Sequence, residues 1–441
     1  MKLSPFWHYI EKVDLLWHAL NFEWKRTSQE IMDIFKKRTC VSLELLSCEN
    51  KEIMHKNGFF STIAEDNKVI HNFLLEAERK KGEIKSLYLI MSTNCNLACS
   101  YCLYAPSQSG SLARCGKNLT QSEIFNALQL FRMKTRHNKR NAPNYWEQVT
   151  FYGGEPLLNA KGLKFGIEMI NRIKREDRIW NDLKIIIDTN GTLIDDDFID
   201  FAKKNQINLQ ISIDGPHMVH DSARKFRNGK GTFDIVRRAM EMLSAEKVNF
   251  LPLITVSPAN INFLPESIEW LCKNFAIDEI AMNLLMHTGK DLKIPYGKLA
   301  AEAMLSGHNM AKRFNVYDSV FSEVLERFSS PNIASEICGA GVKISAFPGG
   351  NLHACQALES CGVGLLGQIT NFDERCANWQ EWKKRSRFSN QICLKCPVLG
   401  FCGGGCAASA FVASGSIHDI DPYYCEWIKK LFELWIDGEI K

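Results

Sequence analysis

Residues 86–102 read SLYLIMSTNCNLACSYC, an apolar run that leads directly into three cysteines. The run Ser86–Ser92 predicts a short strand, because about four to eight consecutive apolar residues bounded by turn formers are typical of a buried strand. Cys95, Cys99 and Cys102 follow at spacings that let one loop gather their thiols. Thiolates are soft ligands for iron or zinc, so this stretch predicts a metal site at the carboxyl end of a strand.

The same pattern recurs along residues 84–320, where short apolar runs alternate with stretches of helical periodicity such as Ser122–Phe131, Leu163–Ile173 and Phe233–Leu243. Strand–helix units in series predict a parallel sheet. We therefore expect an α/β fold, a partial (β/α)6 barrel of the TIM-like kind. The expected strands are Ser86–Ser92, Gln148–Tyr152, Leu183–Thr189, Ile207–Ile213, Phe250–Val256 and Glu279–Leu285.

Unusual polar or glycine-rich segments follow four of these strands. Because parallel α/β folds bind ligands at the carboxyl ends of their strands, the four segments predict one site on one rim. In chain order they are Cys95-x3-Cys99-x2-Cys102, Gly153-Gly154-Glu155-Pro156, Thr189-Asn190-Gly191-Thr192, and Ser212-Ile213-Asp214-Gly215-Pro216 followed by Arg224.

Composition narrows the class of protein. A net charge of +4 gives no argument for a nucleic acid or a membrane surface, and neither a signal peptide nor an apolar run of membrane-spanning length is visible. The chain is therefore expected to be cytoplasmic. In that reducing compartment its 16 cysteines are not a disulfide framework, so metal or redox chemistry is the expected reason for them.

Three local cysteines favour a catalytic metal site. A four-iron cluster on Cys95, Cys99 and Cys102 would keep one iron without a protein ligand, and an open position is what a catalytic site needs. The alternative is a zinc site that takes a fourth ligand from elsewhere in the chain. The glycine-rich Gly153-Gly154-Glu155 segment after the next strand favours the iron–sulfur interpretation.

The cysteine motif, with Tyr101 before its last cysteine, resembles the signature of the radical S-adenosylmethionine (SAM) superfamily. The resemblance implies a [4Fe–4S] cluster on the three cysteines, with SAM chelating the open iron and being cleaved reductively. It also implies contacts to SAM, namely Gly153, Gly154 and Glu155 at the amino group, Asn190, Ser212 and Asp214 at the ribose and methionine, Arg224 at the carboxylate, and Tyr101 near the adenine.

Seven later cysteines carry a second resemblance, to the SPASM extension of radical SAM enzymes, which holds auxiliary [4Fe–4S] clusters. Residues 331–337 contain no cysteine, so one of the two clusters would have three protein ligands unless Cys361 or Cys376 closes it. A pair of zinc sites is the alternative. The implied sets are Cys393, Cys396, Cys402 and Cys425 for one cluster, and Cys338, Cys355 and Cys406 for the other.

The remaining regions are less regular. Residues 1–82 alternate early and then turn helical near residues 27–35, 43–54 and 67–81, which predicts a small winged-helix-like unit. It resembles the elements that bind leader peptides by strand addition in maturases of ribosomal peptides; a generic cap on the barrel is the alternative. Residues 330–430 have little periodicity, so we expect a Cys-rich auxiliary domain held by metal with no large apolar core, followed by a helix end over 431–441.

The resemblances together imply a radical SAM/SPASM peptide maturase. Its partners would be a precursor peptide and a reductant such as flavodoxin or ferredoxin, and its product a thioether or carbon–carbon crosslink. Alternatives are an anaerobic sulfatase-maturating enzyme, a non-catalytic iron–sulfur electron carrier and a zinc-dependent binding protein. The sequence offers no evident general base.

Overall fold

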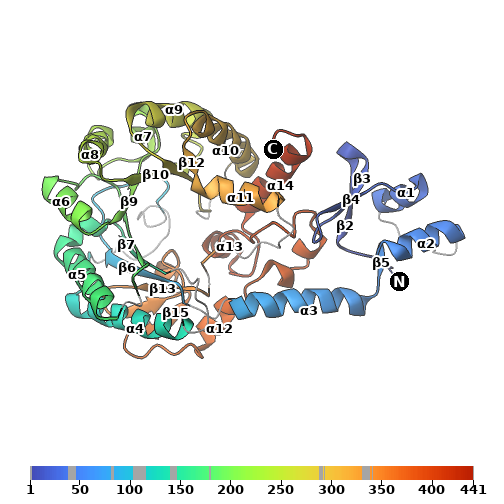
Figure 1. Ribbon diagram of the computed structural model, residues 1–441, viewed down its shortest axis with the longest axis horizontal. Helices are drawn as coiled ribbons and strands as arrows, with labels where there is room; N and C mark the ends of the chain where they lie inside the picture. The colour runs from blue at the N-terminus through green and yellow to red at the C-terminus, as the bar shows by residue number, and fades with distance from the viewer. Residues whose placement is uncertain are drawn as a thin grey trace.

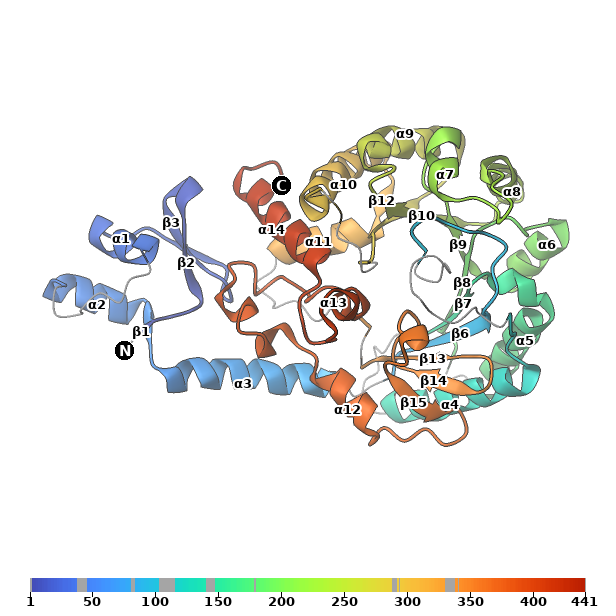
Figure 2. The same cartoon turned by 180° about the vertical axis from the view of Figure 1, so that it is seen from behind.

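The computed structural model describes residues 2–37, 46–80, 84–102, 116–139, 147–177, 180–287, 292, 294–329, 338–339 and 341–440. Most of the chain forms an open α/β barrel with its helices on the outside. A smaller N-terminal unit projects from one side of it (Figures 1 and 2). The long helix α3 (Ile63–Lys80) runs back from this unit towards the barrel side of the molecule.

The main sheet has the strand order β12-β11-β10-β9-β8-β7-β6-β13-β14-β15. Neighbours from β12 to β13 are parallel, whereas β14 and β15 add antiparallel strands at one edge. The parallel strands are β6 Ser86–Ser92, β7 Gln148–Gly153, β8 Lys184–Thr189, β9 Asn208–Ser212, β10 Phe250–Val256, β11 Glu279–Leu284, β12 Tyr317–Asp318 and β13 Lys343–Ala346; β14 is Asn351–His353 and β15 is Leu365–Gln368.

The predicted α/β barrel fold is thus confirmed, and all six expected strands are present. Two parallel strands were not expected. The two-residue strand β12 extends one edge, and β13, from the Cys-rich region, pairs with β6 at the other. The Cys-rich region therefore completes the wall of the barrel.

Alternation along the strands separates the two faces of the sheet. On β8, Ile185 and Ile187 are buried in the core, whereas Ile186 and Asp188 lie half-buried on the opposite, inner face. The outer face is covered by helices that the strands alternate with, as Figure 1 shows. These helices are α4 Gln121–Lys139, α5 Ala160–Asp177, α6 Asp196–Lys204, α7 His217–Ala223, α8 Phe233–Ala245, α9 Leu264–Asn274, α10 Tyr296–Arg313 and α11 Ser319–Ser329.

The expectation that the Cys-rich region buries no large apolar core is wrong. Trp379, Trp382, Phe401 and Trp427 are buried and belong to the same core cluster as the barrel strands. Aromatic side chains from loops and short helices reach this core without any regular sequence period. The helices of this region are α12 Ala377–Lys384, α13 Ala407–Ser414 and α14 Pro422–Ile436, the last of which runs unbroken across residues 430–431.

The N-terminal unit has its own apolar core, which contains Trp7, Leu16, Ile31 and Phe35. Its central sheet is antiparallel in the order β2-β3-β4, so the expected strands followed by helices are present. Part of the helix expected near residues 43–54 lies outside the described residues. The strands are β1 Lys2–Leu3, β2 Trp7–Ile10, β3 Leu15–His18, β4 Glu23–Lys25 and β5 Phe60–Ser61, and the remaining helices are α1 Gln29–Lys37 and α2 Cys48–Lys56.

Aromatic contacts anchor this unit to the Cys-rich region. The Trp17 indole Nε1 donates to the carbonyl oxygen of Pro397 at 2.8 Å, and its ring packs against Phe401 and Phe432. Farther along, Phe73 of α3 stacks on Phe388 with ring centroids 4.8 Å apart. Two separate contacts therefore fix the orientation of the N-terminal unit.

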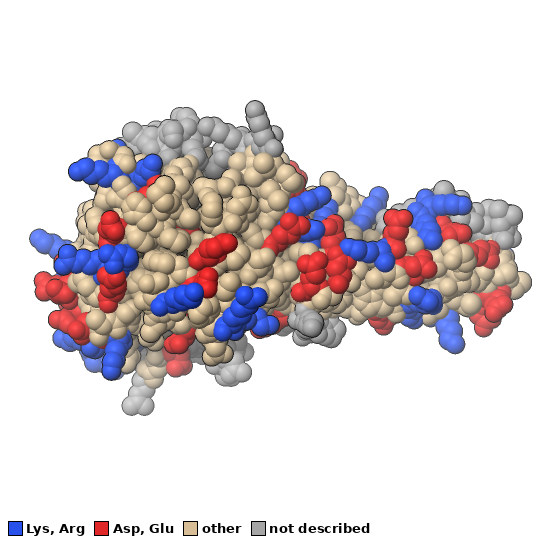
Figure 3. Space-filling model, turned by 90° about the horizontal axis from the view of Figure 1, so that it is seen from above, with Lys and Arg blue, Asp and Glu red and all other residues tan. Residues whose placement is uncertain are grey.

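The charged side chains that the structure describes on one face of the molecule form no patch of a single sign (Figure 3). On the face in Figure 3, basic and acidic side chains are mixed over both the barrel and the N-terminal unit. Among the described helices, none is both long and apolar enough to cross a membrane.

Candidate active site at the barrel rim

The three cysteines after β6 lie in one loop that is tied down at several points. Backbone amides of the loop donate to the end of α7 and to the segment after it: Ser100 N to Ala223 O at 2.9 Å and Ala98 N to Lys225 O at 2.8 Å. This loop, residues 93–102, is called the cysteine loop below. Its backbone therefore holds its shape through contacts that do not involve the thiols.

The thiols of the cysteine loop are partly shielded from water, and the charge of one thiolate raises the pKa of its neighbours. Burial, with further repulsion from neighbouring thiolates, raises the pKa of Cys95 to about 11 and that of Cys99 to about 12. Thiolates gathered at such a place need a cationic group to stabilise them. Three thiols in one short loop are a donor set suited to an iron–sulfur cluster.

The glycine pair after β7 allows the cysteine loop to come close. Gly153 has φ +146°, and a Cβ there would lie 2.4 Å from the carbonyl oxygen of Ser92. A Cβ on Gly154 would lie 2.2 Å from the carbonyl oxygen of Asn94. In the gap that the missing side chains leave, Gly154 N donates to Ser92 O and Glu155 N donates to Asn94 O, both at 2.9 Å. The glycines were expected to admit a ligand; in the structure they admit the cysteine loop itself.

The Glu155 carboxylate joins the ends of β7 and β8. It is fully buried, and it accepts hydrogen bonds from Thr189 Oγ1 at 2.7 Å, Asn190 N at 2.8 Å and Leu157 N at 3.1 Å. Burial nevertheless raises the pKa of Glu155 to about 7. The carboxylate was expected to lie near the amino group of SAM; the structure shows it engaged by the protein, and a contact with SAM remains a prediction.

Asn190 connects the end of β8 to the cysteine loop. Its Nδ2 donates to Asn96 Oδ1 at 2.9 Å and faces Cys95 Sγ at 3.8 Å, while its Oδ1 accepts from Thr192 N at 3.0 Å. Asn96 in turn donates to Thr192 Oγ1 at 2.8 Å. Asn96 was not singled out from the sequence, although its place between two of the cysteines was a signal for it.

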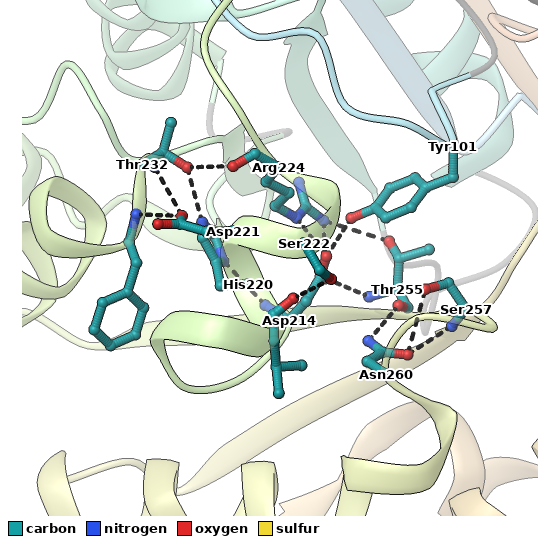
Figure 4. A network of polar contacts seen from close by, with 12 residues as sticks. Tyr101, Asp214, His220, Asp221, Ser222, Arg224, Thr232, Thr255, Ser257 and Asn260 are labelled. Atoms are coloured by element: carbon teal, nitrogen blue, oxygen red, sulfur yellow. Dashed lines mark hydrogen bonds and ion pairs between the residues drawn. The ribbon is translucent and has the colours of Figure 1, made fainter. Parts of the chain in front are cut away.

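Asp214 is the centre of a second network, drawn in Figure 4. Its carboxylate accepts from the Tyr101 hydroxyl, from Arg224 Nε at 3.0 Å and from Thr255 N at 3.1 Å. Asp214 is 1% exposed and Arg224 is 7% exposed. One buried ion pair thus links the end of β9, the cysteine loop and β10.

The structure gives the protein contacts of two further residues that were expected to bind SAM. Arg224 was expected to pair with the SAM carboxylate, but its guanidinium is paired with Asp214 and also donates to Thr255 Oγ1 at 3.4 Å. Ser212 ends β9 opposite Leu253 of β10, half-buried on the inner face. Contacts of either with SAM remain predictions. Thr255 was missed, although strand alternation places it on the inner face.

The seven later cysteines separate into the two groups that the resemblance implied. One group lines a single pocket together with Arg387, and the space of this pocket, open solvent at its mouth included, is about 530 Å³. In the other, burial and then the charges of Cys338 and Cys355 raise the pKa of Cys406 to about 12. The group that lines the pocket consists of Cys393, Cys396, Cys402 and Cys425.

Cys361 and Cys376, the two candidates for a fourth ligand of the second group, have different places in the structure. Cys361 is exposed at the end of the short helix Glu359–Cys361, and Cys376 immediately precedes α12. Within the described ranges, no group of three or more His, Cys, Asp or Glu side chains is arranged to hold a single metal ion.

Residues 89–271 match the family model of the Radical SAM superfamily. The chain contains a radical SAM domain. This domain extends from β6 to α9 and includes the cysteine loop, the glycine pair and both polar networks. The chain is therefore a radical SAM enzyme, which binds SAM and a [4Fe–4S] cluster, as the cysteine motif predicted.

Relatives of the radical SAM enzyme match most of its length. It is 24% identical over 380 residues to the radical SAM cyclopropyl synthase TigE of Paramaledivibacter caminithermalis, covering 81% of this chain and 75% of the relative. It is 26% identical over 363 residues to a cysteine-type anaerobic sulfatase-maturating enzyme of Clostridium perfringens, covering 78% of this chain and 93% of the relative. The chain thus belongs to the group of radical SAM enzymes that includes these maturases.

Two solved structures share its fold. The structure of anSMEcpe with bound AdoMet and Cp18Cys peptide has a TM-score of 0.64 at 22% identity, covering 81% of this chain and 99% of that one. The structure of Streptococcus suis SuiB bound to precursor peptide SuiA has a TM-score of 0.53 at 14% identity, covering 96% and 99%.

The Asp214–Arg224 pair gives a prediction for stability. Asp214→Asn leaves a buried guanidinium uncompensated, so the free energy of unfolding should fall by about 3–5 kcal/mol. Asp214→Asn combined with Arg224→Met should lose less, because no charge then stays unpaired. Urea denaturation of both variants measures this. Equal losses of unfolding free energy in both variants would mean that the Asp214–Arg224 pair does not hold together the segments that carry these two residues.

Proposed function

We propose that Cys95, Cys99 and Cys102 hold the [4Fe–4S] cluster that binds SAM. Their thiols belong to one short loop, whose backbone is hydrogen-bonded to the end of β7 and to Ala223 and Lys225 at and after the end of α7. When bound, the cluster and SAM supply a 5′-deoxyadenosyl radical that abstracts a hydrogen atom. Glu155, Asn190 and the Asp214 network keep the surrounding rim rigid, so that a bound cofactor meets a preorganised site.

We also infer that the two later cysteine groups hold auxiliary [4Fe–4S] clusters. Cationic side chains accompany both groups. Although burial opposes it, the charges of Cys355, Cys338 and Cys406 raise the pKa of Lys343. The charges of Cys425 and Cys396 likewise raise the pKa of Lys429. Positive charge beside thiolates stabilises an electron-rich cluster. The Cys338 group would bind its cluster through three protein ligands, which leaves one iron for a substrate or another group.

The proposed substrate is a precursor peptide, and the observation that carries this proposal is the extent of the likeness to SuiB. That likeness reaches 96% of the chain, which leaves too few residues uncovered to exclude the N-terminal unit. The likeness to anSMEcpe reaches 81%. The antiparallel sheet of the N-terminal unit has two edge strands, β2 and β4, to which an extended peptide could add. SuiB is itself bound to a precursor peptide, SuiA.

The reaction that we propose is the installation of a thioether or carbon–carbon crosslink, with a flavodoxin or ferredoxin as the electron donor. Formation of formylglycine is the second candidate, because the sulfatase-maturating relative is covered over 93% of its length. Both reactions remove two electrons from a peptide side chain. They differ in whether an internal nucleophile traps the oxidised carbon.

Replacement of all three cysteines in the cysteine loop tests the radical chemistry. Cys95→Ala/Cys99→Ala/Cys102→Ala protein should make no 5′-deoxyadenosine from SAM and dithionite, while the absorbance of the later clusters persists. Cys48→Ala/Cys272→Ala, which alters cysteines outside every predicted group, is the matched control and should keep full SAM cleavage. Continued 5′-deoxyadenosine formation by the triple variant would disprove the site.

Mass spectrometry of peptides distinguishes the two reactions. The chain should be co-expressed with the short peptides encoded beside its gene and, separately, incubated with the Cp18Cys peptide, SAM and reductant. A crosslinking maturase should make a neighbouring peptide lighter by two hydrogen atoms with no free aldehyde. An aldehyde on Cp18Cys and unchanged neighbouring peptides would instead support the sulfatase-type reaction.

A further inference from the structure

Asp188 is a charged residue within the apolar strand β8, in the run Lys184–Thr189. Its neighbours Ile187 and Thr189 are buried behind the sheet, so the Asp188 side chain lies on the inner face of the barrel. It is two residues before Asn190, and therefore one layer below the rim that carries the cysteine loop.

The Asp188 carboxylate is not part of the networks that hold the rim. Its Oδ1 is buried without a hydrogen-bond partner, although buried polar atoms are normally paired. Burial, and then the nearby charge of Glu155, raise the pKa of Asp188 to about 7. An unpaired acid that can change protonation near neutral pH is costly for stability and well suited to proton transfer.

The other titratable groups beside Asp188 follow the same inner wall towards the later cysteines. Burial raises the pKa of Tyr88 on β6; the charge of Asp188 raises it further and that of Lys343 lowers it. Lys343 Nζ lies 4.8 Å from the Tyr88 ring centroid. The charge of Cys355 also raises the pKa of Tyr88. Tyr88 and Tyr152 have their ring centroids 5.7 Å apart. Through Tyr88 and Lys343, the Asp188 carboxylate is thus coupled electrostatically to the Cys338, Cys355 and Cys406 group.

We propose that Asp188 is the proton acceptor that completes oxidation of the peptide substrate inside the barrel. This inference rests on the proposed function, and it assigns a general base that the polar networks of the rim do not provide. Glu155 cannot take this place, because both of its carboxylate oxygens already accept hydrogen bonds from the protein.

The reacting substrate carbon bears a hydrogen and is bonded to an N–H, O–H or S–H group. The C–H bond breaks homolytically, and its hydrogen atom leaves with 5′-deoxyadenosine. The remaining substrate radical gives one electron to an oxidised iron–sulfur cluster. The proton of the adjacent group passes to the Asp188 carboxylate, and a double bond forms between that atom and the carbon. A second nucleophile of the peptide can then add to the new double bond.

Asp188→Asn tests the proposal, with Asp188→Glu as the conservative variant. Asp318→Asn is the matched control, because Asp318 is also a buried acid whose pKa burial raises to about 7. Its Oδ2 has no hydrogen bond and lies 4.0 Å from His308 Nδ1. Asp318 lies on the edge strand β12, four strands from β8, and its Oδ1 accepts from Phe321 N at 3.3 Å. It has no place in the proposed chemistry.

Thermal unfolding of the metal-free proteins gives a readout that does not depend on activity. A folded-state pKa above the unfolded value of 3.8 means that the stabilising effect of the neutral acid is lost as pH rises through about 7. Both Asn variants should therefore raise the Tm relative to the native chain, and by more at pH 8 than at pH 5. No gain for Asp188→Asn would overturn the proposal, since the carboxylate would then not be buried and unpaired.

Product analysis separates a base from a structural acid. The assay uses the peptide that is encoded beside the gene and that becomes lighter by two hydrogen atoms when it is co-expressed with the native chain. Asp188→Asn should still cleave SAM, but the product formed per 5′-deoxyadenosine should fall by roughly 100-fold or more, the usual contribution of a general base. Asp188→Glu should recover part of the ratio, and Asp318→Asn should keep all of it. In the native chain the ratio should rise with pH through about 7.

Each other outcome counts against the proposal. An unchanged ratio in Asp188→Asn would show that the proton goes elsewhere. Loss of SAM cleavage itself would assign Asp188 to the cofactor rather than to the substrate. Absence of SAM cleavage in the native chain would remove the proposed function, and this inference with it, and is recognised before any variant is made.

Discussion

The close approach of two backbones at the rim is the constraint on which the site depends. The cysteine loop can lie against the end of β7 only because residues 153 and 154 lack side chains. Two amide-to-carbonyl hydrogen bonds then fix the loop in register with the sheet. Because the thiols belong to this loop, the same contact sets their position relative to every other strand end.

Buried charge holds the remainder of the rim in place. Glu155 joins β7 to β8, and Asp214 with Arg224 joins β9, β10 and Tyr101 of the cysteine loop. Each of these groups is shielded from water. Removing the partner of a buried charge costs several kcal/mol of stability. The rim therefore tolerates little rearrangement, which suits a site that must control a reactive radical. Asp188 differs from these groups because it is shielded and yet incompletely paired.

Much of this arrangement was predictable because it is local. Each central strand is one apolar run, and each motif follows its strand directly, so the fold and the rim could both be predicted. The pairing of β13 with β6 could not, because no local pattern records a contact between residues so far apart. Aromatic burial in the Cys-rich region was missed for the same reason. The sequence placed Glu155 and Arg224 at the rim but could not indicate that protein groups already engage both. Asp188 was visible as a charge in an apolar strand, and alternation could have assigned it to the inner face.

The central claim is that the cysteine loop carries a cluster with one iron open to SAM. Pulsed electron–nuclear double resonance of the reduced, reconstituted protein, with SAM labelled by ¹⁵N at its amino group, tests this directly. The account predicts a hyperfine coupling between that nitrogen and the cluster, which disappears when Cys95, Cys99 and Cys102 are replaced. A reduced cluster on these cysteines that shows no coupling to the bound SAM nitrogen would contradict it.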